Sequence, residues 1–142
     1  MPRTSFEDRQ AWLNEQPDTL VWAVDAILRE LAPKTGLLIL DWARMLDVTL
    51  LTSDQLRRGL ERMHEGGLLV WDSDACAVFL YGHQLAHPVE ARGLGTLDAH
   101  LMHCNFPAGP ALDAWLIEYD LMVQLQRNTA KGVGLSLVRG GC

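Results

Sequence analysis

The chain is organised around residues 52–81, which read TSDQLRRGLERMHEGGLLVWDSDACAVFLY. The first half of this stretch has the pattern of one amphipathic helix. Thr52 can cap the helix N-terminus, and Gln55, three residues later, can reach back to complete a capping box. Apolar residues at helical spacing form one stripe: Leu56, Leu60 and Met63. Gly66 and Gly67 end the helix, because glycine takes the left-handed conformation at no steric cost.

The second half of the stretch predicts a β-hairpin. Two short runs, Leu68–Trp71 and Ala77–Tyr81, are rich in aliphatic and aromatic residues. The residues between them have turn chemistry: Asp72, Ser73 and Asp74. A capped helix followed by a tight hairpin is the second half of a winged helix-turn-helix.

The preceding residues supply the first half of that arrangement. Ser5 can cap a short first helix that ends near Pro17, and Asp18 can cap a second helix over Thr19–Leu31. Leu37–Leu40 fits a small strand that could pair with the hairpin, and Asp41 can cap a short helix after it. The order from Thr19 is helix, strand, helix, helix, strand, strand, which is the winged-helix order. Residues 52–65 then occupy the position of the recognition helix.

The sequence after Tyr81 predicts a helical appendage. Residues 82–95 look like an extended linker, residues 97–104 could form a short helix, and Pro110 starts an amphipathic helix that runs to about Gln126. The prediction is a mainly α fold with a small β-hairpin, in four parts: 1–81 winged-helix domain with N-terminal helix, 82–95 linker, 96–126 C-terminal helices and 127–142 flexible tail.

Composition limits the function classes. The 142 residues carry a net charge of −6, which is awkward for a nucleic-acid-binding protein, so any DNA contact must rest on a local basic patch. No apolar run reaches the length of a membrane span, and the polar N-terminus is unlike a secretory signal. The three cysteines form no CxxC pair, so a cytoplasmic protein without a disulfide framework is expected.

One basic cluster lies on the predicted recognition helix. The candidate nucleic-acid-binding residues are Arg57, Arg58 and Arg62, with Arg44 on the preceding helix. Arg58 and Arg62 are four apart and should share the solvent face, while Arg57 can pair with Glu61. The alternative is a solvated helix face whose charge nearby acidic residues balance. Acidic residues at the hairpin turn count against DNA contact, because a wing along the backbone usually carries basic residues.

A second cluster is apolar and lies on the last predicted helix. It comprises Leu112, Trp115, Leu116, Tyr119 and Met122. Burying each large side chain is worth roughly 1.5–3 kcal/mol, so this face must find a surface. It could fold back onto the N-terminal helices around Phe6 and Trp12, or it could form the partner or dimer interface of a two-fold homodimer.

No pattern of catalytic or metal-binding residues stands out. Histidines recur after the hairpin together with one cysteine: His83, His87, His100, His103 and Cys104. Gln84 stands where a zinc protease would need its glutamate base. Scattered packing histidines therefore account for the group better than a zinc site. No nucleophile elbow, P-loop or dinucleotide fingerprint occurs, so we expect no enzymatic activity, no cofactor and no metal.

The run GLLVWDSDACAVFLYGHQLAHPVEARG at residues 67–93 resembles phage and prophage replication initiators and replisome organisers. LDAHLMHCNFPAGPALDAWLIEYD, at residues 97–120, resembles the continuation of that pattern, in which a short helix, a proline break and another helix follow. The resemblance implies a winged helix that binds origin or single-stranded DNA and recruits the host helicase or its loader. The acidic charge and the lack of the long C-terminal domain that such proteins often carry depart from the pattern.

Two functions follow as hypotheses. The first is a non-enzymatic winged-helix protein of phage or prophage type that binds DNA or a replication partner through the helix at residues 52–65. The second is an acidic interaction module or inhibitor that binds a bacterial replication or defence protein, such as a nuclease complex or helicase, without contacting DNA. Charge complementarity would steer that second protein to a basic partner surface.

Overall fold

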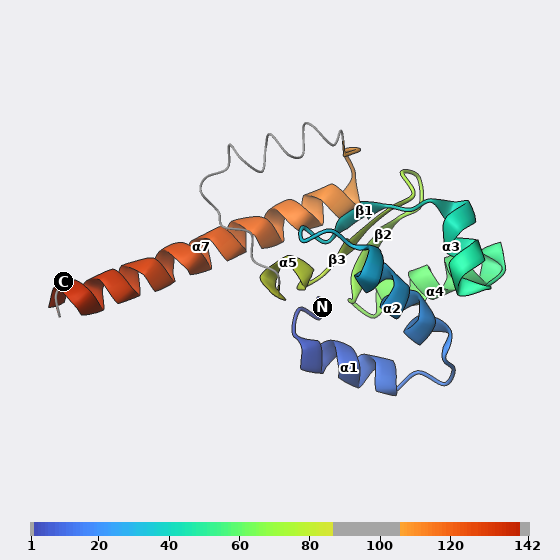
Figure 1. Cartoon of the computed structure of the whole chain (residues 1–142), viewed down its shortest axis with the longest axis horizontal. Coiled ribbons are helices and arrows are strands. Elements are labelled where there is room, and N and C mark those ends of the chain that lie inside the picture. The colour runs from blue at the N-terminus through green and yellow to red at the C-terminus, as the bar shows by residue number, and fades with distance from the viewer. Residues whose placement is uncertain (1, 87–105, 140–142) are drawn as a thin grey trace.

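The computed structural model describes residues 2–86 and 106–139. The described part is mainly helical with one small antiparallel sheet (Figure 1). The elements follow in this order: α1 (Phe6–Asn14), α2 (Leu20–Leu31), β1 (Leu37–Ile39), α3 (Trp42–Thr49), α4 (Ser53–Glu65), β2 (Leu69–Asp72), β3 (Ala77–Leu80), α5 (His83–Ala86) and α7 (Pro110–Arg139). Among the described residues, no helix is both long and apolar enough to cross a membrane.

Local capping chemistry sets the starts of three helices, as the sequence predicts. The Ser5 side chain accepts a hydrogen bond from the Asp8 N–H, and Asp41 accepts one from the Arg44 N–H. Thr52 and Gln55 form the complete capping box of α4. α2 begins at Leu20, one residue later than predicted, and the side chain of Thr19 makes no capping bond; the carboxylate of Asp18, the predicted cap, accepts a hydrogen bond from the Leu20 N–H.

The sheet has the strand order β1-β3-β2, with β3 in the centre. The predicted strand at residues 37–40 is confirmed: Leu37 pairs with Phe79 and Ile39 with Ala77. β2 and β3 form the predicted hairpin, with Leu69 opposite Leu80. β2 begins at Leu69 and includes Asp72, one residue later at each end than the sequence predicts.

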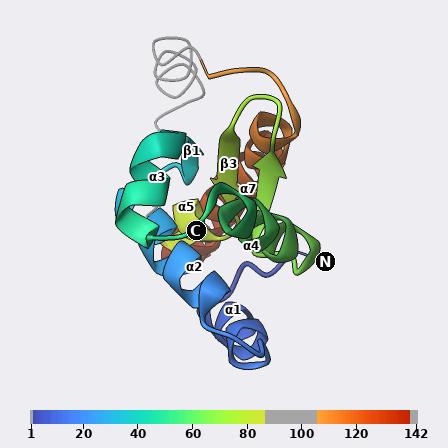
Figure 2. The same cartoon turned by 90° about the vertical axis from the view of Figure 1, so that its right-hand side faces the viewer.

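Side chains of the strands alternate between two separate cores. One face of the sheet packs with α2 and α4, and its sheet residues are Leu69, Val78 and Leu80. The other face packs with α7, and its sheet residues are Leu37, Val70, Ala77 and Phe79. The described part is therefore layered, with helices on both faces of the sheet; Figure 2 turns the molecule by 90° to show it from the side.

The C-terminal part differs from the sequence prediction in length and in place. The predicted helix ends near Gln126 before a flexible tail, but α7 continues to Arg139 through Asn128 and two glycines. It packs on the sheet and not on α1 around Phe6 and Trp12, because the strands carry a second apolar face that needs cover. Figure 1 shows the rest of α7 extending well beyond the other elements.

The predicted linker is only partly described. Residues 83–86, which the sequence places in an extended linker, form the single helical turn α5 after Gly82. The predicted helix at residues 97–104 lies outside the described residues, as does the rest of the linker.

Candidate nucleic-acid interface

The helix α4 is held in place by one buried face, which leaves its opposite face to solvent. Its buried residues are Leu56, Gly59, Leu60 and Met63. Gly59 lies where α4 packs on α2: a Cβ at this position would be 3.5 Å from Cγ2 of Val24. That distance is an ordinary van der Waals contact, so the helix crossing does not require a glycine here. The two helices share the same core, which fixes the direction of the exposed face.

Arg57 and Arg58 are exposed on that face. Nη2 of Arg58 lies 3.2 Å from Oδ2 of Asp54, and the two side chains are 64% and 73% exposed. An ion pair of this kind contributes little, so the Arg58 guanidinium can exchange Asp54 for another anion at small cost. The guanidinium carbon of Arg57 lies 5.9 Å from the ring centre of Trp42. Arg57 therefore stacks on α3, where the sequence predicts a pair with Glu61.

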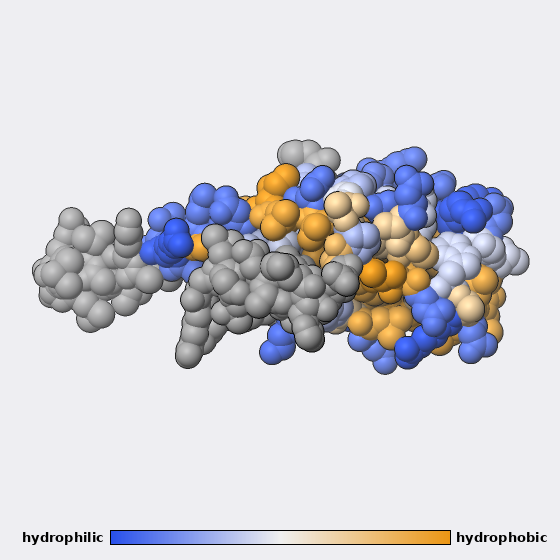
Figure 3. Space-filling view, turned by 90° about the horizontal axis from the view of Figure 1, so that it is seen from above, coloured by the Kyte–Doolittle hydropathy of each residue, from blue (hydrophilic) through white to orange (hydrophobic). Residues whose placement is uncertain are grey.

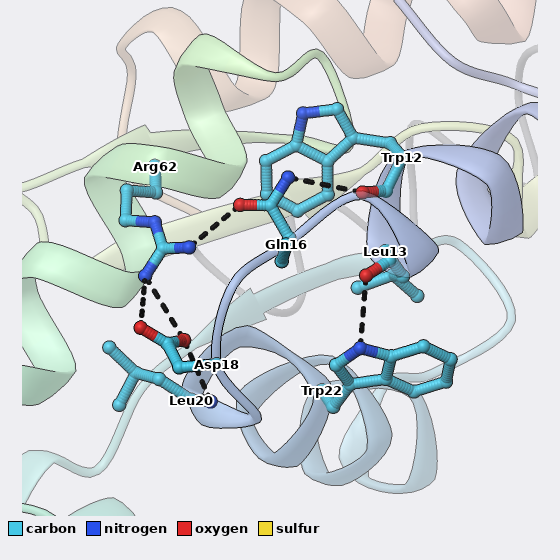
Figure 4. A network of polar contacts seen from close by, with 7 residues as sticks. All are labelled: Trp12, Leu13, Gln16, Asp18, Leu20, Trp22 and Arg62. Atoms are coloured by element: carbon cyan, nitrogen blue, oxygen red, sulfur yellow. Dashed lines mark hydrogen bonds and ion pairs between the residues drawn. The ribbon is translucent and has the colours of Figure 1, made fainter.

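Arg62 lies on the same side of α4 as Arg58, but its side chain is only 30% exposed and is engaged within the fold. Figure 4 shows its guanidinium directed at the connection between α1 and α2. Nη1 donates to both carboxylate oxygens of Asp18, at 3.3 and 3.2 Å, and Nη2 donates to Oε1 of Gln16 at 2.7 Å. Gln16 in turn donates to the Trp12 carbonyl at 3.0 Å, and Asp18 accepts from the Leu20 N–H at 3.2 Å.

Arg62 therefore stabilises the fold by joining α4 to the connection between α1 and α2. Its partners lie 44 and 46 positions away in the sequence, so helical periodicity alone gave no sign of them. A residue that already serves Asp18 and Gln16 has fewer donors left for a phosphate or a base.

Two hollows border these arginines. Arg58 and Arg62 both line a groove of about 460 Å³ between α4 and the start of α2, whose other lining residues include Asp18 and Gln55. Arg44 is exposed on α3 beside a smaller hollow of about 170 Å³, which it lines with residues of β1. Of the four candidate arginines, Arg44, Arg57 and Arg58 are exposed and Arg62 is partly buried.

The hairpin turn is acidic. The side chain of Asp72 is buried and accepts a hydrogen bond from the Ala75 N–H at 3.2 Å, whereas Asp74 is exposed. Cys76 takes a positive φ of 52° at the end of the turn. The turn offers a carboxylate to its surroundings and no basic residue.

The predicted partner interface on α7 falls largely in the core. Trp115, Tyr119 and Met122 are buried, and the Trp115 and Tyr119 rings stack with centres 5.0 Å apart. All three pack against the sheet of the same chain, so they do not form a free surface for a second copy. Leu112 is partly buried in the same core, and only Leu116 of the five is exposed.

The histidine and cysteine group is described only in part. His83 is buried in α5, while His87, His100, His103 and Cys104 lie outside the described residues. Within residues 2–86 and 106–139, no three His, Cys, Asp or Glu side chains are grouped so that they could hold a metal ion. The Cys76 thiol is half-buried 3.5 Å from the Leu40 carbonyl, and burial raises its pKa.

Glu118 is a buried carboxylate that was not predicted from the sequence. Glu118 on α7 is buried and accepts the Gly82 N–H at 2.9 and 3.2 Å through its two oxygens. Burial raises the pKa of the Glu118 carboxyl above its ordinary value, although hydrogen bonds from Gly82 and Gln84 act in the opposite direction. The signal was available in principle, because a glutamate stands between Trp115 and Met122 on the apolar face of the helix.

Comparisons with known proteins add no assignment to this geometry. The chain matches no protein-family model, no curated protein and no solved structure.

Proposed function

We propose that this chain is a winged helix-turn-helix module of the phage or prophage replication type, and that it contacts nucleic acid through the exposed face of α4. The element order from α2 to β3 and the strand order β1-β3-β2 support the winged-helix reading. In this reading α4 is the recognition helix and the β2–β3 hairpin is the wing.

The observation that carries the proposal is the exposed pair Arg57 and Arg58. Both follow a complete capping box, so the helix that presents them is well defined at its N-terminal end. Their present contacts are an exposed ion pair and a contact with one ring, both of which nucleic acid can replace at small cost. Arginine suits phosphates and guanine edges, and Arg44 adds a third exposed cation on the neighbouring helix.

Fluorescence anisotropy of labelled DNA tests this proposal. Duplex and single-stranded oligonucleotides are titrated at low salt with the wild type, with the double variant Arg57→Ala/Arg58→Ala and with Lys34→Glu. The last variant changes the net charge by the same amount, but at the exposed turn before β1. We expect the double variant to bind at least about tenfold more weakly and Lys34→Glu to bind nearly as the wild type does. Equal weakening in both variants, or no binding by the wild type, would refute the proposal.

A protein partner is the second candidate function, and a specific observation favours it. Arg62 is engaged within the fold, the hairpin turn is acidic, and the whole chain carries −6. Such a surface complements a basic face on another protein. A pull-down from nuclease-treated bacterial lysate separates the two candidates: a stoichiometric protein that remains after nuclease treatment supports the interaction module, whereas nucleic acid alone supports the first proposal.

A further inference from the structure

An apolar line remains exposed on α7 after the helix has packed on the sheet. Ile117, Leu121 and Leu125 are spaced four residues apart and are 74%, 50% and 51% exposed. They lie side by side on one face of the helix and form a contiguous apolar patch, and the largest such patch on a protein is often functional. Figure 3 shows apolar atoms gathered where α7 lies against the rest of the molecule.

A hollow of about 240 Å³ lies directly beside this line. α7 supplies one wall through Ala114, Ile117, Glu118 and Leu121. Residues at i, i+3, i+4 and i+7 are the four that form the hole for a knob in helix-to-helix packing. The opposite wall consists of Pro2, Thr4 and Tyr81.

We propose that a second copy of this chain covers the line, with the two α7 helices antiparallel and a two-fold axis at Leu121. The spacing supports this register. In an antiparallel pair centred on Leu121, Ile117 lies opposite the partner's Leu125, and each Leu121 meets its own copy. The hole on α7 is centred between residues 117 and 118, so the partner's Leu125 is the side chain that fills it.

Charges on one flank of the line fit the same register. Asp113 and Arg127 lie on the same side of α7 relative to Leu121, eight residues before it and six residues after it. Reversal of the partner helix brings Asp113 and the partner's Arg127 within about 3 Å of each other along the helix axis, given a rise of about 1.5 Å per residue. The two-fold axis forms this ion pair twice.

One contact in the pair is unfavourable. Asp120 lies on that flank beside the centre and faces the partner's Asp120. Within one chain, Nε2 of Gln124 donates to Oδ2 of Asp120 at 3.4 Å, which moderates the repulsion. The register therefore predicts that removal of this charge strengthens the dimer.

A heterologous partner explains these features less well. A face whose apolar spacing is symmetric about one residue, and whose acidic and basic residues exchange places on reversal, is complementary to itself. The inference concerns α7 alone and does not depend on nucleic-acid contact by α4.

The first test is mass in solution, by multi-angle light scattering over a range of protein concentrations. The wild type should show twice the chain mass at high micromolar concentration. Leu125→Glu should weaken the dimer at least about tenfold without a change in circular dichroism, because Leu125 is exposed in the single chain. Leu50→Glu is the matched control, since Leu50 is 87% exposed on the connection between α3 and α4. Asp120→Asn should tighten the dimer.

The second test is the register, by disulfide crosslinking in a chain whose native cysteines are replaced by serine. Leu121→Cys should crosslink with its own copy. Ile117→Cys should not, but it should crosslink when mixed with Leu125→Cys. Equal self-crosslinking at all three positions would contradict the antiparallel register. A wild type that remains monomeric at high micromolar concentration, or a Leu125→Glu variant that dimerises as tightly as the wild type, would overturn the proposal.

Discussion

Arg58 and Arg62 are one helical turn apart on α4, yet their surroundings give them different roles. Arg58 has one exposed partner four residues away, whereas Arg62 bonds to two residues of the α1–α2 connection. The hydrogen bonds of Arg62 join parts of the chain that are far apart in the sequence. An exposed ion pair within one helix, such as that of Arg58, contributes little to the free energy of unfolding. We therefore expect Arg62 to contribute to stability and, under the proposed function, Arg58 to contribute to binding.

Arg62→Ala should lower the free energy of unfolding by about 1–2 kcal/mol, because it removes the bonds to Asp18 and Gln16. Arg58→Ala should change it by less than about 0.5 kcal/mol and should act on nucleic-acid affinity instead. Urea unfolding monitored by tryptophan fluorescence measures both. Equal destabilisation by the two variants would contradict the assigned roles.

Glu118 predicts a distinct pH dependence. Its pKa is raised in the folded chain, so the folded state binds a proton more readily than the unfolded state. Stability from this group is therefore gained as the pH falls through the raised folded pKa, and it is lost again as the pH returns to neutral. The difference in unfolding free energy between the wild type and Glu118→Gln, measured from mildly acidic to neutral pH, should show this slope. If the difference in unfolding free energy between the two proteins does not change with pH, the raised pKa of Glu118 does not contribute to stability.

At the scale of single elements, two glycines of one segment should respond in opposite ways to alanine. At Gly59 an added Cβ meets Val24 at an ordinary 3.5 Å, and alanine favours the helix by about 0.5–1 kcal/mol. At Gly66 the Cβ would lie 2.4 Å from the Trp12 ring, so the ring must shift, at a cost of about 1–3 kcal/mol. Thermal unfolding should show Gly59→Ala above the wild type and Gly66→Ala below it.

The sequence predicted where helices and strands form better than it predicted which elements pack against one another. Ser5, Asp41 and Thr52 cap helices as their sequence positions indicate, because capping depends only on residues within one turn. The docking of α7 on the sheet was missed, although the hairpin held a signal. Val70 and Phe79 interrupt strict alternation with apolar residues, and strands that are apolar on both faces need cover on both.

The end of α7 and the contacts of Arg62 could not be predicted from the sequence. Asn128, Gly132 and Gly134 have low helix propensity, which favours an end near Gln126, but the helix continues to Arg139. Helical periodicity places Arg62 on the same side of α4 as Arg58. It gives no information about contacts with other elements, so it could not indicate the bonds from Arg62 to Asp18 and Gln16. The candidate site could thus be placed on α4 from sequence, but the sequence could not show which of its arginines are free.

At the scale of the whole molecule, a few exposed arginines must attract nucleic acid although the net charge of the chain is −6. Each phosphate contact releases counterions, so the slope of log K against log salt concentration is about −0.9 per contact for duplex DNA. Arg44, Arg57 and Arg58 together should therefore give a slope no steeper than about −3. Anisotropy titrations at several salt concentrations measure it; a much steeper slope would mean that other cations of the chain make the contact.

The most direct test of the central claim maps the contact surface. Isotope-labelled protein is titrated with duplex or single-stranded DNA, and backbone amide shifts are followed by NMR. The account predicts that the largest shifts fall on the exposed face of α4 around Arg57 and Arg58, with Arg44 of α3, and that α7 is unchanged. Shifts confined to α7 or to the acidic turn of the hairpin, or no shifts at low salt, would contradict the assignment of α4 as the nucleic-acid-binding helix.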